Sequence, residues 1–425
     1  MRRPLSIVIA IIVCAAAVTA AWRVWPHVRG LRPALLSSPR EASRPAAAIT
    51  PAVSDAEPRT PPSDGEAPSR NTTGFPLVLA PGLSIGTYAT GLGKPRVLLM
   101  DGRGTLLVSV PSSGKVLALP DRDRDGVADE TRTVVDGLDR PHGLALRTTD
   151  GWQLSIAETG AVASYAYDPE AMRATNRRKL FDLPAGGGHF TRTLLVARAD
   201  DGEERLLVSV GSSCNACAER DARRATVLSA RLDGSDLRTF ARGLRNAVFL
   251  ATHPTTGAVW VTEMGRDLLG DDLPPDEINI LQEGADYGWP YCYGKNVRDP
   301  FNSRGRVNCS EKMTSHVDLP AHSAPLGLAF VPQDGWPAAW QGDLLVAFHG
   351  SWNRTEPTGY KIVRFDLDAT GAPVGAPQDV ISGWLSADDR AYGRPVDLLF
   401  APDGALYISD DKAGVVYRVM YDGAR

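Results

Sequence analysis

The sequence lacks an excess of charge of either sign. Its 425 residues include 46 lysines and arginines and 50 aspartates and glutamates, which gives a formal net charge of −4 at pH 7. Acidic and basic residues are interleaved along the chain, so no basic face is concentrated enough to bind a phosphate backbone. We therefore expect no nucleic-acid partner.

Cysteine is scarce, with five residues in the whole chain. The first, Cys14, lies in an apolar segment, and the other four form an even set whose three possible pairings the sequence does not rank. We favour the local pairs Cys214–Cys217 and Cys292–Cys309 as small structural disulfides. The motif "CNAC" is also compatible with half of a zinc site or a redox motif. However, no second CxxC or HxxxH follows it, and no histidine comes directly after it for haem attachment.

One long apolar segment stands at the start of the chain, from about Leu5 to Val24, behind two arginines and flanked by two tryptophans. About 20 apolar residues are enough to span a bilayer, and aromatic residues suit its interface. The small residues 18–20 also form an acceptable cleavage site for a signal peptide. We expect residues 1–30 to be a transmembrane anchor or a signal peptide, with the anchor favoured. Either one places the remaining chain at the periplasmic or extracellular face, tethered to the inner membrane if the anchor is kept.

Core-forming residues are almost absent from residues 31–74, which are rich in proline, alanine, serine and charge. Such a composition favours a semi-extended, disordered linker. We therefore expect a tethered domain that covers residues 75–425.

That domain shows little helical periodicity. Instead, short apolar strands separated by Gly, Asp and Pro turns recur at intervals of about 45 to 80 residues. Six openings of this kind are present: "KPRVLLMD" (94–101), "RPHGLAL" (140–146), "GGHFTRTLLVA" (187–197), "LRNAVFLATHP" (244–254), "SAPLGLAFVP" (323–332) and "GRPVDLLFAPDG" (393–404). Each is followed by a partner strand of the type "LLVSV". The repeats predict an all-β fold, a six-bladed β-propeller.

The last blade of a propeller must be closed. The segment "LSIGTYA" (83–89) stands before the first repeat, and "GVVYRVMY" (414–421) ends the last one. We expect these two segments to pair, because their pairing joins the two ends of the domain and removes an exposed sheet edge.

In a propeller the innermost strands run along a central channel, so equivalent positions of the repeats converge at one mouth of it. Five of the six openings carry a cationic or titratable side chain there: Arg96, His142, His189, Arg245 followed by Asn246, and Arg394. Any one of these is ordinary as a solvated charge or a hydrogen-bonded histidine. Five together would repel one another unless an anion lay among them. The pattern predicts a ligand rich in carboxylate or phosphate.

Two further segments add candidates for the same mouth. "AFHGSWNRTEPTGYK" interrupts the fifth blade, and it offers Trp352 to a planar ligand and Arg354 to an anionic one. The acidic, turn-rich stretch 262–294 in the fourth blade is either a solvated loop or a calcium site built from carboxylates and turn carbonyls.

A separate acidic run, "DRDRDGVADE" (121–130), matches the start of a D-x-D-x-D-G calcium loop. The twelfth position holds Arg132, where an EF-hand needs a bidentate glutamate. Both a calcium site and a solvated turn stay open here.

These segments together resemble the quinoprotein glucose/sorbosone dehydrogenase family, soluble enzymes with a six-bladed propeller that use pyrroloquinoline quinone (PQQ) and Ca²⁺. The resemblance covers roughly Leu77 to Val419, and its most specific stretch is "GLRNAVFLATHPTTGAVWVTEMGRDLLGDDLPPDEINILQEGADYGWPYCYG" (243–294). The segments "HGSWNRTEPTGYK" and "VGSSCNACAERDARRA" are more similar to the sorbosone dehydrogenase-like branch.

The resemblance implies roles for several residues. His189 would be the catalytic base that takes the hydroxyl proton while hydride moves to the quinone. Arg245 and Asn246 would hold the quinone and one carboxylate of PQQ, with Arg245 also stabilising charge on the reduced cofactor. Arg394 would bind another carboxylate.

Some positions depart from the glucose enzymes. His142 stands where they have a glutamine beside the cofactor, and Val396 where they have a second PQQ-binding arginine. Their carboxylate-binding lysine has no clear equivalent, and Arg354 is the candidate for that role, with Trp352 beside it. These departures bear more on the substrate than on the cofactor.

The resemblance also implies two metal sites. The backbone carbonyls of Gly265 and Arg266 would hold the active-site calcium, although the glucose branch usually has proline at the second position. Glu277 and Tyr287 would belong to a structural calcium site.

The expected activity is PQQ-dependent oxidation of a sugar, a sugar aldehyde or a similar alcohol, with an electron acceptor that the sequence does not identify. Two alternatives stay open. A calcium-dependent lactonase or hydrolase on the same kind of propeller would need carboxylate or asparagine ligands in the channel. A non-enzymatic propeller would bind protein or glycan.

Overall fold

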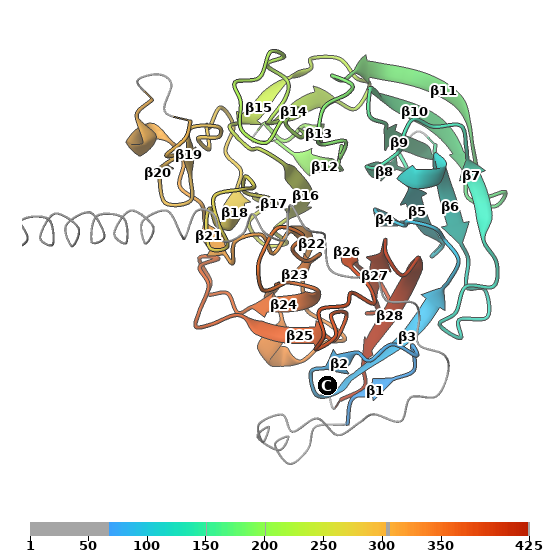
Figure 1. The fold of residues 1–425 in the computed structure, drawn as a ribbon. Coiled ribbons are helices and arrows are strands. Elements are labelled where there is room, and N and C mark those ends of the chain that lie inside the picture. The colour runs from blue at the N-terminus through green and yellow to red at the C-terminus, as the bar shows by residue number, and fades with distance from the viewer. Residues whose placement is uncertain (1–67, 150, 200, 303–306, 424–425) are drawn as a thin grey trace, which may run out of the picture.

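The computed structural model describes residues 68–149, 151–199, 201–302 and 307–423. Six main sheets, four of four strands and two of five, are arranged as blades around a central axis (Figure 1). The predicted six-bladed propeller is confirmed. No helix within the described ranges is long and apolar enough to cross a membrane. The prediction for residues 1–30 lies outside the described part of the chain, as does most of the predicted linker.

The first three blades are built from strands that follow one another along the chain. The first consists of β4 (Leu98–Met100), β5 (Leu106–Val110), β6 (Lys115–Leu119) and β7 (Arg132–Val135), with a short 3₁₀ turn, η1 (Pro111–Ser113). The second consists of β8 (Leu144–Arg147), β9 (Gln153–Ala157), β10 (Ala161–Asp168) and β11 (Arg173–Asp182). The third consists of β12 (Leu194–Arg198), β13 (Glu204–Val210), β14 (Thr226–Arg231) and β15 (Arg238–Arg242).

The other three blades carry insertions or borrowed strands. The fourth consists of β16 (Ala247–Thr252), β17 (Val259–Glu263), β18 (Asp276–Ile280) and β21 (Val317–Leu319), with an insertion that holds β19 (Cys292–Tyr293), β20 (Val297–Arg298) and η2 (Cys309–Glu311). The fifth consists of β22 (Pro325–Phe330), β23 (Leu344–Phe348), β24 (Lys361–Phe365), β25 (Gln378–Ser382) and β2 (Val78–Leu79), with η3 (Ala338–Trp340). The sixth consists of β26 (Pro395–Phe400), β27 (Leu406–Asp410), β28 (Val415–Tyr421), β3 (Leu83–Ala89) and β1 (Arg70–Asn71).

The first strand of each blade lies innermost. β4, β8, β12, β16, β22 and β26 each contact the first strands of both neighbouring blades, so they form a closed ring. These are the six strands that the repeat openings predicted. The second strands β5, β17, β23 and β27 are buried at every residue, which is why most of their residues are apolar. The loops that precede the inner strands therefore meet at one end of the axis.

The two ends of the domain are joined as predicted. β3 pairs antiparallel with β28, with Ile85 opposite Val419, and β1 adds to β3 in parallel. The sixth blade also includes residues before the predicted boundary at Phe75. The Asn71 side chain donates to the Phe75 and Leu77 carbonyls, so residues just before the boundary belong to the sixth blade and not to the linker.

Both favoured disulfides are present, Cys214–Cys217 and Cys292–Cys309. The first closes a short loop after β13, and the second joins β19 to η2 in the insertion of the fourth blade. The two sulfurs of "CNAC" are bonded to each other, so they are not free to bind zinc.

Candidate functional site

His189 lies in the loop between β11 and β12, five residues before the strand begins, and not at the strand's first residue. The preceding glycines shape this loop. Gly186 and Gly187 have φ of +77° and +84°, and a Cβ on Gly187 would come within 2.7 Å of the Ser213 Cα. The glycines at positions 186 and 187 are therefore explained by the protein backbone itself, without a ligand that approaches them closely. The left-handed backbone and packing against Ser213 require glycine at position 187.

The hydrogen bonds of His189 fix its tautomer. Its Nδ1 lies 3.1 Å from the Ser212 carbonyl oxygen and 2.9 Å from the Ser212 hydroxyl, and that hydroxyl donates to the Cys214 carbonyl at 2.6 Å. A carbonyl can only accept, and the hydroxyl has already given its proton, so Nδ1 must carry the hydrogen. The Nε2 of His189 is then an unprotonated nitrogen with a free lone pair, which is the form that a general base needs.

The environment of His189 keeps the ring neutral. Burial, followed by the nearby Arg245 guanidinium, lowers its pKa to about 3. The Ser212 carbonyl opposes this shift without reversing it. The imidazole is therefore uncharged at neutral pH.

Two buried guanidiniums hold the His189 loop. Arg192 donates to the carbonyls of His189, Thr191 and Pro184, and Arg224 donates to those of Pro184, Ala185 and Gly186. The side chain of Arg192 is completely buried, and burial together with Arg224 lowers its pKa to about 10. Both arginines are thus bound through carbonyl oxygens.

The side chains of Asn246 and His189 both pack against Gly211. A Cβ on Gly211 would come within 2.6 Å of both the Asn246 Oδ1 and the His189 Cβ. The Asn246 Oδ1 accepts from the Thr191 hydroxyl at 3.0 Å, and its backbone N–H donates to the Glu263 carboxylate. The structure therefore brings together Asn246 and His189, which the sequence placed in different blades.

Arg245 is buried, and every nitrogen of its guanidinium has a partner. Nε donates to the Asn215 carbonyl and Nη2 to the Asn215 Oδ1, both at 2.9 Å. Nη2 also forms an ion pair with Asp267 at 2.7 Å, and Nη1 donates to the Gly265 carbonyl at 2.9 Å. A carbonyl oxygen has two lone pairs, so this bond leaves one at Gly265 for a further ligand.

A second cluster surrounds Arg394. Its Nη1 donates to the Gly350 carbonyl at 2.9 Å and lies 3.3 Å from the His349 Nδ1, and its Nη2 donates to the Tyr360 hydroxyl at 2.8 Å. The His349 Nε2 lies 2.8 Å from one oxygen of Asp411, and Arg96 forms an ion pair with the other at 2.8 Å. Arg96 and Arg394 are thereby linked through two side chains.

Asp411 is a site residue that the sequence reasoning missed. Burial alone would raise its pKa, but His349 and Arg96 hold it well below its usual value. Its position follows from the hairpin register in the structure. Pro395 pairs with Asp410, so the residue after Asp410 falls at the same end of the blade as Arg394.

The connection 349–354 joins the two clusters. Gly350 and Ser351 offer their carbonyls to Arg394, whereas the Asn353 side chain donates to Asp267, the ion-pair partner of Arg245, at 2.9 Å. Arg245 and Arg394 are therefore fixed to one short segment. Trp352, in the middle of it, is 42% exposed and open to a ligand.

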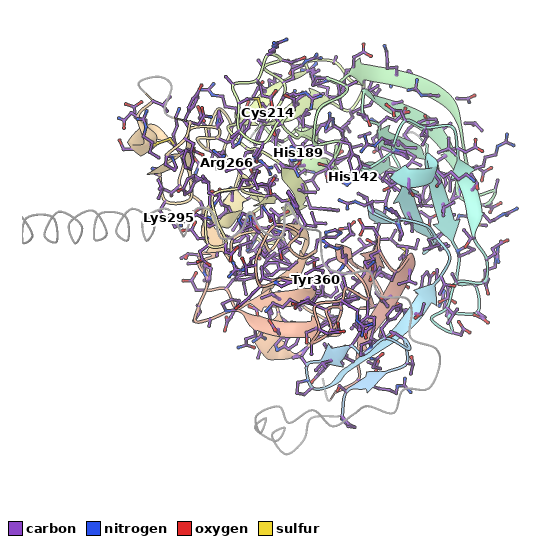
Figure 2. The ribbon with its side chains drawn as sticks, viewed as in Figure 1. His142, His189, Cys214, Arg266, Lys295 and Tyr360 are labelled. Atoms are coloured by element: carbon purple, nitrogen blue, oxygen red, sulfur yellow. A yellow bond between two sulfur atoms is a disulfide. The ribbon has the colours of Figure 1, made fainter. Side chains whose placement is uncertain are left out.

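The other two predicted cofactor contacts are placed differently. His142 is completely buried next to Phe190 and Phe249, and its Nδ1 is 3.4 Å from the Thr193 hydroxyl. Its Nε2 has no hydrogen-bond partner among the described residues. Burial and Arg96 hold its pKa well below 6.5. Figure 2 shows His142 and His189 on the inner side of the ring, with Cys214 near His189. Arg354 donates to the Asp271 carbonyl and pairs with Asp272, so its guanidinium is bound to the 271–272 turn.

The site holds an excess of positive charge. Asp267 and Asp411 each neutralise a guanidinium, but Arg140, Arg192, Arg224 and Arg394 form no ion pair with any carboxylate of the described residues. Arg140 instead lies over the Phe190 ring, 4.0 Å from its centroid. Like charges gathered in a partly buried site favour a bound anion. This donor set fits a planar polyacid.

The predicted metal residues lie together beside Arg245. Gly265, Arg266, Glu277 and Tyr287 line one small cavity, and a further buried carboxylate, Glu263, also lines it. Burial and proximity to Glu277 hold the pKa of Glu263 well above its usual value. The Arg266 side chain points to Asp299, with which it forms a buried ion pair at 2.9 Å. The Tyr287 hydroxyl donates to the Ile280 carbonyl.

The acidic run 121–130 lies apart from these residues, in the connection from β6 to β7. One carboxylate oxygen each from Asp121, Asp123 and Asp125 lies within 4.8 Å of the others, and the Arg122 side chain pairs with Asp129 and Glu130. This arrangement is compatible with both a calcium site and a solvated turn, so the calcium site in this loop stays a prediction.

Comparisons with known proteins agree with this picture. The family model described as TrAA12-like matches residues 77–422. A pyrroloquinoline quinone-dependent pyranose dehydrogenase of Coprinopsis cinerea is 26% identical over 407 residues, which cover 81% of this chain and 54% of that protein. This chain thus spans about half the length of that relative. A pyrroloquinoline quinone-dependent sugar dehydrogenase of Hypocrea jecorina is 27% identical over 401 residues, 80% of this chain and 88% of that one.

Among solved structures, the holo form of the PQQ domain of the Coprinopsis cinerea pyranose dehydrogenase is similar, with a TM-score of 0.70 and 24% identity. The match covers 83% of this chain and all of that domain, and it shows the same fold. The family model covers nearly the whole propeller, from β2 to β28. The chain therefore belongs to the TrAA12-like family.

Proposed function

We propose that this protein is a PQQ-dependent dehydrogenase that oxidises a sugar. The observation that carries the proposal is the combination, at one mouth of the propeller, of carboxylate-free guanidiniums with a neutral histidine whose Nε2 is unprotonated. The printed names of the relatives from Coprinopsis and Hypocrea support PQQ as the anion and a sugar as the substrate. A lactonase would have no use for unpaired arginines at this place.

The side chains suited to hold PQQ are Arg96, Arg245, Asn246 and Arg394, with Trp352 beside them. PQQ is a planar quinone with three carboxylates; when bound it would supply the hydride acceptor for substrate oxidation, and Ca²⁺ would supply a Lewis acid. Arg96 and Arg245 are already ion-paired with Asp411 and Asp267, so Arg394 is the arginine of this set whose charge is not balanced by a carboxylate of the described residues. Arg245, already paired with Asp267, would stabilise negative charge that develops in the reaction.

His189 acts on the substrate. Its Nε2 accepts the proton of the hydroxyl that is being oxidised, while Ser212 keeps the other ring proton on Nδ1. The ring is neutral before the substrate binds, because burial, followed by the charge of Arg245, disfavours the imidazolium form. In this proposal His189 is the general base, and the arginines bind negative charge.

We also propose that calcium binds beside Arg245. The carbonyls of Gly265 and Arg266 would hold the ion near the cofactor, and Glu277 and the Tyr287 segment would hold a structural ion. The buried glutamates support this proposal, since a carboxylate buried without a cation is costly unless protonated.

Export to the periplasmic or extracellular face, through residues 1–30, is part of the proposal. The two disulfides support it, because such bonds persist in oxidising compartments.

The proposal is tested with purified protein stripped of metal and cofactor. PQQ is titrated in the presence and absence of Ca²⁺ and followed by quinone absorbance, and then a panel of aldoses and other sugars is offered with an artificial dye as electron acceptor. We expect saturable, calcium-dependent PQQ binding and dye reduction with at least one sugar. Absence of PQQ binding by folded protein would overturn the proposal.

A further inference from the structure

Asn215 occupies an unusual place between two blades. It is the second residue of the loop Cys214–Cys217, which the disulfide closes immediately after the third blade's β13. Its contacts, however, are with residues of the fourth blade. Both its side chain and its carbonyl take part.

On one side, Asn215 binds the guanidinium of Arg245. Its carbonyl accepts from Nε and its Oδ1 from Nη2, both at 2.9 Å. Two acceptors from one residue meet two neighbouring nitrogens, Nε and Nη2, on one side of a planar group, so they fix its plane as well as its position. Asp267, by comparison, contacts Arg245 at Nη2 alone.

On the other side, the same side chain binds the turn after β17. Its Oδ1 also accepts from the Asp267 backbone N–H at 2.8 Å, and its Nδ2 donates to the Asp267 carbonyl at 3.0 Å. The Asn215 side chain thus pairs with both polar backbone groups of Asp267, as a neighbouring strand would in a sheet. These two bonds hold the turn 265–267, which contains Gly265 and Arg266.

The disulfide acts on Asn215 through the backbone. Joining Cys214 to Cys217 leaves two residues between the bridged positions, which limits the conformations open to Asn215. The Asn215 carbonyl also accepts from the Trp289 indole N–H at 3.3 Å. The loop is therefore tied at its base by a covalent bond and at its tip by hydrogen bonds.

We propose that Asn215, presented by the Cys214–Cys217 loop, is a positioning residue of the site: it sets the orientation of the Arg245 guanidinium and of the 265–267 turn at the same time. This inference rests on the proposed function, in which Arg245 and that turn face the cofactor and its calcium. Asn215 itself acts through Arg245 and Asp267.

The test compares Asn215→Ala, Asn215→Asp and the surface control Asn308→Ala, whose side chain forms hydrogen bonds with Ser310 and Glu311 and lies far along the chain from Asp267. Hydrogen exchange of the apoprotein is measured over peptides containing Asp267. Asn215→Ala removes the acceptor of the Asp267 N–H, so exchange there should become faster. Asn215→Asp keeps an acceptor oxygen for both Arg245 and Asp267, so it should restore most of the protection. Asn308→Ala should leave that peptide unchanged.

A second measurement uses PQQ. Asn215→Ala should weaken PQQ binding by about tenfold and lower kcat at saturating PQQ, with little change in KM for the sugar, whereas Asn215→Asp should lie between it and wild type. The double variant Cys214→Ser/Cys217→Ser should shift exchange and PQQ affinity in the same direction as Asn215→Ala, because it frees the loop.

The outcomes separate the two proposals. Unchanged exchange in folded Asn215→Ala, or PQQ affinity equal to wild type, overturns the positioning role. Failure of the wild-type protein itself to bind PQQ overturns the proposed function instead, and the exchange data then still decide whether Asn215 holds the turn.

Discussion

The hydroxyl of Ser212 stands between His189 and Cys214: it accepts from the His189 Nδ1 at 2.9 Å and donates to the Cys214 carbonyl at 2.6 Å. A serine hydroxyl has one proton, and here it is directed away from the imidazole. The Ser212 carbonyl, 3.1 Å from the same nitrogen, can likewise only accept. Both contacts therefore place the ring proton on Nδ1 and leave Nε2 as the basic nitrogen of His189.

Replacing the proposed base should separate binding from turnover. We expect His189→Ala to lower kcat by about 10²- to 10⁴-fold, the usual contribution of a positioned base, and to leave the PQQ dissociation constant nearly unchanged. Steady-state dye reduction and a PQQ titration measure the two quantities on one preparation. Full turnover in the alanine variant would remove His189 from the role of base.

The lowered pKa of His189 predicts a particular pH dependence. Because burial and Arg245 bring this pKa to about 3, the base stays unprotonated from pH 8 to pH 5, and kcat/KM should show no inflection near 6.5 that is due to His189. An inflection there that disappears in His189→Gln would contradict the prediction.

Stability should respond to the same shift. The unfolded chain takes up a proton on this histidine near pH 6.5 and the folded chain does not, so the contribution of neutral His189 is present above pH 6.5 and declines as the pH falls toward 3. The free energy of unfolding of wild type relative to His189→Ala, measured by denaturant titration at several pH values, should fall over that range.

Two glycines of ordinary backbone conformation form a matched pair. Gly211→Ala should disrupt the contact of His189 with Asn246, because its Cβ would lie 2.6 Å from both residues, and should lower kcat and PQQ affinity by at least tenfold. Gly188→Ala should be tolerated, because its nearest neighbour, the Ser213 carbonyl oxygen, is 3.5 Å away. Thermal unfolding of both variants checks that they fold. If the Gly211→Ala and Gly188→Ala variants were equally active, the packing of His189 and Asn246 against Gly211 would not matter for activity, contrary to this prediction.

PQQ binding should depend on the planar shape of the Arg394 guanidinium as well as on its charge. Its two terminal nitrogens bind the Gly350 carbonyl and the Tyr360 hydroxyl, a fork that lysine does not reproduce. We expect Arg394→Lys to weaken PQQ binding by about tenfold and Arg394→Ala to weaken it more. Lys361→Ala, which removes a surface ion pair with Asp379, is the control. Affinity equal to wild type in Arg394→Ala would exclude this arginine from the binding site.

The fold could be predicted from the sequence because each blade repeats the same local pattern, and because two unmatched segments at the ends of the domain needed a partner. Pairing of Leu83–Ala89 with the last strand follows from that logic alone. The place of Asn71 in the sixth blade could not be predicted, since Asn71 and its neighbours have the composition of a linker and are held by hydrogen bonds to residues farther along the chain.

Repeat position correctly placed His189 next to Asn246, which the structure shows packed together around Gly211, whereas the roles of His189, Asn246 and Arg394 stay predictions. The site was not predictable where it depends on how loops from different blades meet. Nothing in the letters "SCNAC" or "SDDKAG" shows that Asn215 reaches Arg245 or that Asp411 joins Arg96 to His349. The direction of a long side chain was equally hidden: Arg354 turns toward Asp271 and Asp272.

The seam between β3 and β28 sets an order for folding. During synthesis the strand Leu83–Ala89 emerges early, whereas its partner Val415–Tyr421 emerges last. Until then the earlier strand has an unpaired edge that is free to associate with other chains. The ring of blades can close only after its last strand has been synthesised. A chain truncated before Val415 would therefore lose more than one strand, because five complete blades would lack the β3–β28 pairing that closes the ring.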